Sequence, residues 1–260
     1  MATNRFGGTR CIGFGFSPIV NDYKIVVIYN DRGRDKVWGV YQVRVYSLWA
    51  KSWKEIEFGN LEGLYIDSYH HSVSANGDVF WFGFKSADDD YCSVVSFDMA
   101  NEIFTVIPLP ASGYDCFVKS LTVYENNLAL LCTGWIAQNE HCVKLWVMEK
   151  GSRTSGERWI WTHKYTSNIC SGLAMLFPIT IWGNEIMCEP EFESDPESES
   201  ESESEGEEDD DPITPLYMFN IASNEFRIFS IPDCGKGSSL IIENYVESLV
   251  SISNILVENP

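Results

Sequence analysis

Short apolar segments separated by short turns run along almost the whole chain. Within many segments apolar and polar residues alternate, and Val, Ile, Phe, Tyr and Trp are frequent. Alternation has the period of a β-strand, and β-branched and aromatic side chains suit a half-buried pleated surface. No apolar stripe with helical spacing is long enough to compete with this pattern. The sequence therefore predicts an all-β fold.

Pairs of these segments recur four times with the same layout. Each pair is an apolar strand that carries one aromatic residue, a turn, and a second strand. The aromatic residues are Tyr46, Phe97, Trp146 and Phe219. The first two spacings are about 50 residues, the period of kelch-type repeats, and the third returns to roughly this value once an acidic insert is subtracted. The insert is therefore interpreted as a loop on a repeated scaffold.

A further hairpin precedes each pair. In three repeats its turn contains residue types that readily adopt the positive φ of tight hairpins: Asn76-Gly77, Asn126-Asn127 and Gly183-Asn184. Four strands per repeat are the pattern of a β-propeller blade, and a blade needs neighbours to bury both of its faces. We predict a β-propeller-like array of about four four-stranded blades, with closing strands in residues 240–257, that forms an incomplete ring.

The predicted connections sort onto two edges of the array. With the strands of a blade named a to d in chain order, the a–b turns are short, whereas the b–c and d–a connections are long and leave from one edge. Long loops on a rigid scaffold are where binding surfaces are normally built, and aromatic residues often dominate their binding energy. The candidate partner-binding residues are Tyr65, Tyr69, Tyr114 and Trp135, of which Tyr114 and Trp135 could equally cap the core.

Most of the formal net charge of −20 is concentrated in one insert. Fourteen acidic and no basic residues lie between Glu189 and Asp211, which leaves 24 acidic against 18 basic residues, or −6, for the rest. We predict one domain over residues 1–260, with a disordered acidic loop at 189–214 inserted in it, because such a segment cannot bury enough apolar surface to fold. A generally basic surface is absent, which argues against nucleic acid as a partner.

The acidic insert repeats a Ser-x-x-Glu pattern that acidophilic kinases prefer. Five serines have a glutamate three residues later and are candidate phosphorylation sites: Ser194, Ser198, Ser200, Ser202 and Ser204. Phosphorylation would add negative charge and favour basic partners. The alternative is that the insert is only a solvated spacer.

The chain gives no sign of secretion or membrane insertion. Its first residues have no apolar signal region, and no apolar run is long enough for a membrane-spanning helix. The eight cysteines form no C-x-x-C pair, and most lie in apolar segments, which favours buried free thiols in a reducing compartment. We expect a cytoplasmic or nuclear protein, or one found in both.

No group of residues suggests catalysis, a cofactor or a metal. Gly13-x-Gly15 lacks the third glycine and the following helix of a dinucleotide-binding loop, so we interpret these glycines as points where backbones approach closely. His70-His71, His141 and His163 do not have zinc-site spacing, and no Gly-x-Ser-x-Gly motif is present. We therefore expect no enzyme activity, no cofactor and no metal site.

Several segments, in order, give the sequence a family resemblance. Residues 13–18 followed by 21–26 resemble the entry motif of the F-box-associated domain of plant F-box proteins. Further matches follow in the family's order and extend the resemblance over nearly the whole chain: 45–48 with 52–54, 77–81, 96–98 with Glu102 and Phe104, and 245–250.

The resemblance implies a protein-recognition module, the substrate-binding part of a Skp–cullin–F-box ubiquitin ligase subunit, with an unknown target protein as partner. It implies binding to the Skp adaptor only if an F-box lies upstream, and this chain begins shortly before residue 13 without one. The alternative is a free-standing binding propeller, or a truncated decoy, that does not dock to a ligase.

Overall fold

A computed structural model describes residues 9–32, 38–68, 71–85, 92–111, 116–137, 140–150, 159–168, 170–171, 175–190 and 213–232. These residues form strands and one short 3-10 helix, η1 (Gly59–Leu61). The strands are β1 (Thr9–Ser17), β2 (Asp22–Arg32), β3 (Trp38–Ser47), β4 (Ser52–Glu55), β5 (Tyr65–Ile66), β6 (Val73–Ala75), β7 (Asp78–Phe84), β8 (Cys92–Asp98), β9 (Ile103–Pro108), β10 (Cys116–Tyr124), β11 (Asn127–Ala137), β12 (Glu140–Lys150), β13 (Trp159–Thr166), β14 (Cys170–Ser171), β15 (Leu176–Trp182), β16 (Glu185–Pro190), β17 (Ile213–Asn220) and β18 (Phe226–Pro232).

The strands form four antiparallel sheets, each built from consecutive parts of the chain. Blade 1 has the order β1-β2-β3-β4, and blade 2 has β5-β7-β8-β9 with β6 also paired to β7. Blade 3 has β10-β11-β12-β13 with β14 paired to β12, and blade 4 has β15-β16-β17-β18. The prediction of an all-β array of four-stranded, propeller-like blades is confirmed.

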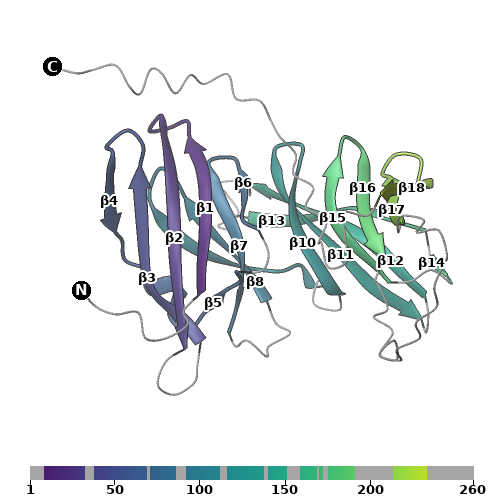
Figure 1. Cartoon of the computed structure of the whole chain (residues 1–260), viewed down its shortest axis with the longest axis horizontal. Coiled ribbons are helices and arrows are strands. Elements are labelled where there is room, and N and C mark those ends of the chain that lie inside the picture. Colours follow the sequence, from purple (N-terminus) through teal and green to yellow (C-terminus); the bar gives the residue numbers. More distant parts are fainter. Residues whose placement is uncertain are drawn as a thin grey trace, which may run out of the picture.

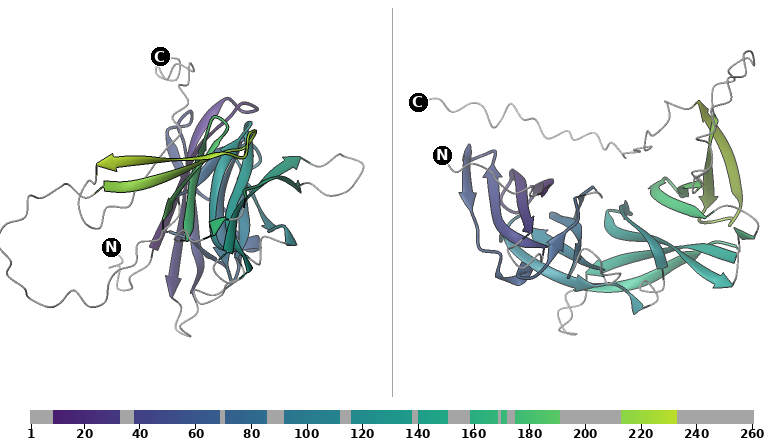
Figure 2. Two further views of the ribbon diagram at one scale, coloured as in Figure 1. Left: turned by 90° about the vertical axis from the view of Figure 1, so that its right-hand side faces the viewer. Right: turned by 60° about the horizontal axis from the view of Figure 1, so that its bottom comes forward.

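The four blades follow one another along an open arc (Figure 2). The β1–β2, β10–β11 and β15–β16 turns lie on its upper edge, which we call the short-turn edge (Figure 1). Because adjacent strands are antiparallel, the ends of β2 and β11 and the starts of β3 and β12 lie at the opposite edge, which we call the long-loop edge. The sorting of connections onto two edges therefore agrees with the sequence analysis.

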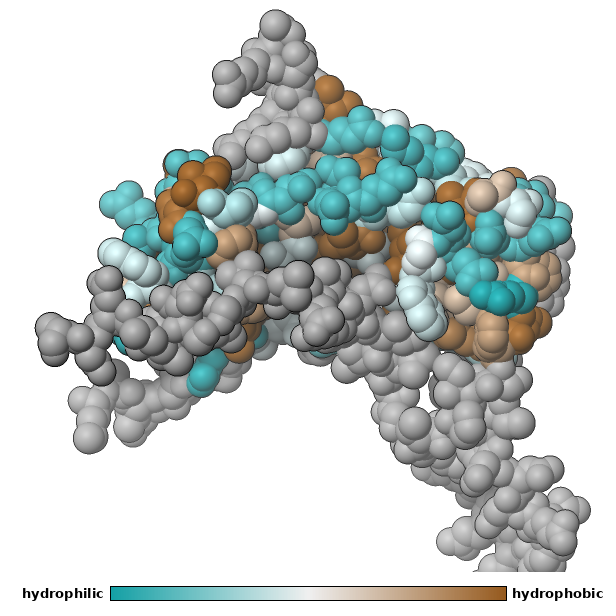
Figure 3. Space-filling view, turned by 90° about the horizontal axis from the view of Figure 1, so that it is seen from above, coloured by the Kyte–Doolittle hydropathy of each residue, from teal (hydrophilic) through white to brown (hydrophobic). Residues whose placement is uncertain are grey.

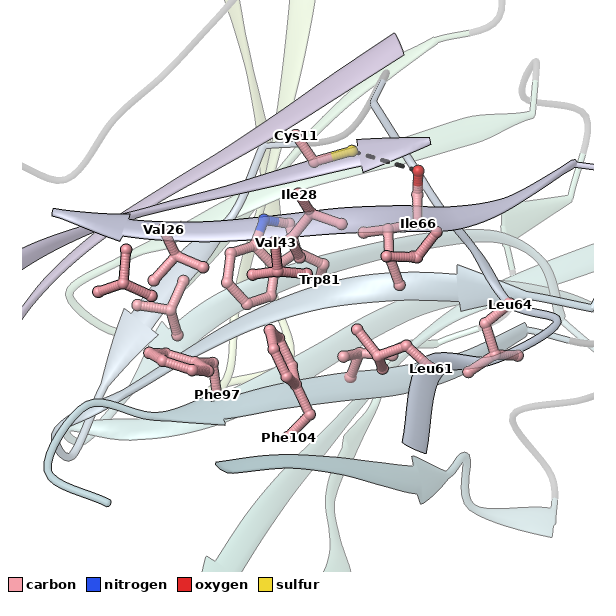
Figure 4. Close-up of a cluster of buried hydrophobic side chains, with 14 of the residues drawn as sticks. Cys11, Val26, Ile28, Val43, Leu61, Leu64, Ile66, Trp81, Phe97 and Phe104 are labelled. Carbon is pink, nitrogen blue, oxygen red and sulfur yellow. Dashed lines mark hydrogen bonds between the residues drawn. The ribbon is translucent and has the colours of Figure 1, made fainter. Parts of the chain in front are cut away.

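Apolar side chains on both faces of the inner sheets hold neighbouring blades together. Six of the seven residues of β7 are buried, which requires that both faces of the sheet are covered at this strand. Trp81 (Figure 4) and Val79 belong to the core shared with blade 1, whereas Phe80 and Phe82 belong to the core shared with blade 3. In blade 1, by contrast, β1 alternates between buried and more exposed positions, as a sheet covered on one face should.

Two glycines let β1 approach blade 2 closely. A Cβ atom at Gly13 would lie 2.3 Å from Trp81 and 2.6 Å from Val79, and one at Gly15 would lie 2.8 Å from Met99. The distances at Gly13 are far inside van der Waals contact, so a residue without a side chain fits there against the buried β7, whereas at Gly15 the nearest atom is the flexible end of Met99. The expected approach of two backbones at Gly13 and Gly15 is therefore wrong in one respect, because it is side chains of blade 2, such as those of Trp81, Val79 and Met99, that pack on the backbone of β1.

The borders of the acidic insert differ from the predicted range 189–214. β16 continues to Pro190, and β17 already begins at Ile213. The sheet extends over both ends of the insert because Glu189 pairs with Phe177 of β15 and Thr214 pairs with Ile231 of β18. Residues 191–212, with the five candidate serines, and the predicted closing strands at 240–257 lie outside the described residues.

We predict that Gly13→Ala destabilises the protein by about 1–3 kcal/mol, the usual cost of forcing an extra methyl group into a packed core. The added methyl group must displace the Trp81 ring or separate β1 from β7. Thermal unfolding followed by circular dichroism would measure the effect as a lowered Tm. Gly59→Ala is the matched control, because a Cβ atom there has no neighbour within 4 Å. Equal Tm values for the two variants would contradict the close-approach argument.

Candidate protein-binding surface

At the long-loop edge of blade 3, two large apolar side chains face solvent. Trp135 and Ile136, near the end of β11, are 50% and 52% exposed. The register between β11 and β12 shifts between Trp135 and Ala137, so Ile136 is an extra residue in a β-bulge. Bulges bend a strand and redirect its side chains, and they are frequent beside functional sites. This bulge leaves three consecutive residues, Trp135 to Ala137, exposed.

His141 supports Trp135 from the neighbouring strand. The two residues pair across β11 and β12, and their rings meet edge to face with centroids 5.9 Å apart. His141 is 1% exposed, and burial lowers the pKa of its imidazole, which favours the neutral ring. The indole therefore packs on a fixed, uncharged partner, which reduces the side-chain freedom that binding would otherwise remove.

Blade 1 has a similar arrangement at the same edge. A register shift after Tyr29 makes Tyr41 the extra residue of a bulge between β2 and β3. The Tyr41 ring is 49% exposed and lies 6.0 Å from the Tyr29 ring, and the Arg10 guanidinium lies 5.9 Å from the centroid of Tyr29. A second exposed aromatic site, with a cation beside it, thus lies at the long-loop edge.

Tyr41 and Ile136 were not predicted from the sequence, although the chain carries a signal for the first. Val40 and Val43 are both buried. Their separation of three residues breaks the two-residue period of a strand, and such a break indicates a bulge between them. Ile136 has no comparable signal, because its exposure depends on where the pairing between the end of β11 and the start of β12 stops.

The four aromatic residues nominated from the sequence have different surroundings. Trp135 is exposed as expected, whereas the expectation that Tyr65 is exposed is wrong. Tyr65 is 9% exposed because the short β5 pairs with β7 and places it opposite Phe84, and its hydroxyl lies 3.2 Å from the Ser68 Oγ. Tyr69 and Tyr114 lie outside the described residues. A binding role for any of the four stays a prediction.

A buried asparagine fixes the backbone of the long-loop edge between blades 1 and 2. Asn30 Nδ2 donates to the carbonyl oxygen of Ile66 at 2.8 Å, and Asn30 Oδ1 accepts from the Ile66 N–H at 3.1 Å. Cys11 Sγ donates to the same carbonyl oxygen at 3.2 Å (Figure 4). Burial raises the pKa of the Cys11 thiol to about 12, so it stays protonated and can act as a donor. The segment that carries Tyr65 is thereby held against β2.

The described residues hold no candidate metal cluster, no exposed thiol and no membrane-spanning helix. Among them, no three His, Cys, Asp or Glu side chains lie together as a metal site would require. The cysteines of this part of the chain are buried free thiols. No helix in it is long and apolar enough to cross a membrane. What remains at the long-loop edge is a set of exposed aromatic and apolar side chains on a rigid sheet.

The sequence matches the family model described as the F-box associated beta propeller domain over residues 2–252. This chain belongs to that family. The match covers nearly all of the chain, so the resemblance inferred from the motifs is confirmed. The described blades are thus the structural core of an F-box associated domain.

The curated relatives are F-box proteins of Arabidopsis thaliana. The F-box/kelch-repeat protein At3g23880 is 25% identical over 121 residues, which cover 46% of this chain and 32% of that protein. The putative F-box protein At3g21120 is 28% identical over 134 residues, or 48% and 36% of the two chains. The F-box protein CPR1 is 26% identical over 154 residues, or 53% and 36%. The matched region is thus about a third of each relative's length.

A solved structure was also found. Acylaminoacyl peptidase from Pyrococcus horikoshii superposes with a TM-score of 0.43 at 9% identity, over 86% of this chain and 33% of that one. A likeness this weak carries no argument about fold or activity. The assignment of this F-box associated domain depends on the family match and on the blades themselves.

We predict that Asn30→Ala destabilises the domain by about 1–3 kcal/mol, because the buried Ile66 N–H loses its acceptor. Urea denaturation would give the loss of stability, and hydrogen exchange should show faster exchange at Ile66. Asn60→Ala is the control, since Asn60 is exposed and its Nδ2 makes one hydrogen bond, to the Phe104 carbonyl oxygen. If the two alanine variants lose the same stability, the hydrogen bonds of Asn30 to the Ile66 backbone do not stabilise the domain as argued.

Proposed function

We propose that this F-box associated domain captures a target protein at its long-loop edge, as the substrate-recognition part of an F-box ubiquitin ligase subunit. The observation that carries the proposal is the pair of bulges at one edge, each of which presents an exposed side chain beside an aromatic contact: Tyr41 with Tyr29, and Ile136 with Trp135. The family match and the F-box relatives support the ligase setting.

The chemistry of this edge favours a partner with apolar and basic groups. Exposed Trp and Tyr side chains on rigid strands lose little conformational entropy on binding and often dominate interface energy. The acidic insert leaves from the end of β16, at the same edge, and would steer a basic partner toward it. Phosphorylation of Ser194, Ser198, Ser200, Ser202 and Ser204 would strengthen that bias.

Ligase docking is proposed only for a gene product that carries an F-box, which would bind the Skp adaptor. We assign the domain no reaction of its own and no metal or cofactor, and we place its action in the cytoplasm or nucleus. A free-standing propeller or decoy would use the same edge to bind the same target. The two differ in what happens to the target after capture.

We predict that Trp135→Ala lowers recovery of the target by about tenfold or more, since truncating a central aromatic anchor costs about 2 kcal/mol or more. The full-length gene product and its variant would be expressed in plant cells, and co-purified proteins compared by quantitative mass spectrometry. Trp49→Ala is the matched control, because Trp49 is 75% exposed but lies in the β3–β4 turn at the short-turn edge.

A protein lost with Trp135→Ala but retained with Trp49→Ala is the expected result, with both variants keeping the wild-type Tm. Identical sets of partners for the two variants would remove the long-loop edge as the capture site. Deleting the gene then separates the two functions. A target that accumulates after deletion is a ligase substrate, whereas a target with unchanged half-life supports the decoy.

A further inference from the structure

Blade 4 has a second apolar cluster on the face that points away from blade 3. Ile186 and Phe219 pack into the core shared with blade 3. Met187, Leu216 and Met218 alternate with them along β16 and β17, so they lie on the opposite face. They form a cluster to which, within the described part of the chain, only blade 4 contributes.

A groove of about 710 Å³ runs over this cluster. Met187, Leu216 and Met218 are among the residues that line it, and Trp182 and Phe229 line it too, with exposures of 65% and 42%. Seen from the short-turn edge, hydrophobic surface appears at the right-hand end of the arc, where β15–β18 lie (Figure 3). In blades 1 to 3, an apolar sheet face of this kind is covered by the next blade.

The earlier blades show what covers such a face. β6 and β7 of blade 2 lie against β1 of blade 1. β10 and β11 of blade 3 lie against β6 of blade 2. β15 of blade 4 lies against β10 and β11 of blade 3. In every case the first strands of a blade pack on the blade before it.

We infer that residues 240–257 of this chain cover the groove on blade 4, as the first hairpin of a fifth blade. The occupant is thus a segment of the same chain, which comes after β18 in the sequence.

The length of the connection fits this assignment. Residues 233–239 separate β18 from the segment, and they are as many as residues 109–115, which connect β9 to β10. Seven extended residues span at most about 25 Å, which suits a step to the neighbouring face.

The sequence of the segment also fits. It is rich in Ile, Leu and Val, and Glu243-Asn244 stands between its apolar parts as Glu125-Asn126 stands between β10 and β11. The family match extends through residue 252, so the chain beyond β18 belongs to the same domain as the four blades.

Photo-crosslinking of the full chain tests the inference directly. Benzoylphenylalanine would replace Trp182 at the rim of the groove, and the crosslinked peptides would be identified by mass spectrometry. We expect crosslinks to residues 240–257 of the same molecule. The control places the same group at Trp49, which is also an exposed tryptophan at the short-turn edge but lies in blade 1, and should give no crosslink to that segment.

Two outcomes would overturn the inference. Crosslinks from position 182 to a second copy, with a yield that rises with protein concentration, would mean that the groove is an interface between chains. Crosslinks only to other parts of the same chain would mean that another segment fills it.

A second measurement covers the case in which the probe disturbs the groove. A chain that ends at Ser239 should lose hydrogen-exchange protection in β16 and β17, and a synthetic peptide of residues 240–257 should restore it. Peptides from β2 in blade 1 serve as the internal control and should exchange at the same rate in both chains. Unchanged protection of β16 and β17 after truncation would contradict the inference, whereas global unfolding leaves the decision to the crosslinks.

Discussion

The fold depends on one constraint, which is that a sheet with apolar side chains on both faces must be covered on both. β7 is buried on its two faces, so blade 2 requires blade 1 on one side and blade 3 on the other. Repetition of this requirement along the chain gives the arc, because each new blade covers its predecessor and presents a fresh apolar face. The same requirement explains why Gly13 lies where β1 meets Trp81.

In β2, apolar contacts stabilise the packing of blade 1 on blade 2, and polar bonds fix how the two blades are aligned. Its face toward blade 2 is apolar in the middle and polar at each end. Lys24 Nζ donates to the Met99 carbonyl oxygen at 2.5 Å and to Glu102 Oε1 at 2.7 Å, while Asn30 is bonded to the Ile66 backbone. Burial raises the pKa of Glu102, but hydrogen bonds from two lysine side chains outweigh it and leave that pKa below its ordinary value. Directional bonds at both ends fix one register where apolar contacts alone would allow several.

The sequence was informative where structure is local. Asn76 and Gly77 have the positive φ values of 52° and 82° that their turn predicted, and the four strands per repeat follow from the recurring pairs of segments and the turns between them. It failed where the ends of the strands and the details of their pairing decide the outcome. Tyr65 is buried because β5 pairs with β7, and the bulge at Ile136 depends on where the pairing of β11 with β12 ends, whereas the spacing of Val40 and Val43 does indicate the bulge at Tyr41. The candidate surface was therefore predicted as an edge, but only partly as residues.

Stability and the proposed recognition use different parts of the same blades. The faces carry the apolar contacts, whereas the long-loop edge carries connections that begin after strand pairing has ended. The entropy of closing a loop rises only slowly with its length, so an insert at this edge costs the scaffold little. The strongly acidic insert between Pro190 and Ile213 shows this, since β16 and β17 still pair from Glu185 with Asn220 to Cys188 with Tyr217. Length and charge at the long-loop edge can therefore change while the stacked faces, and with them the fold, remain the same.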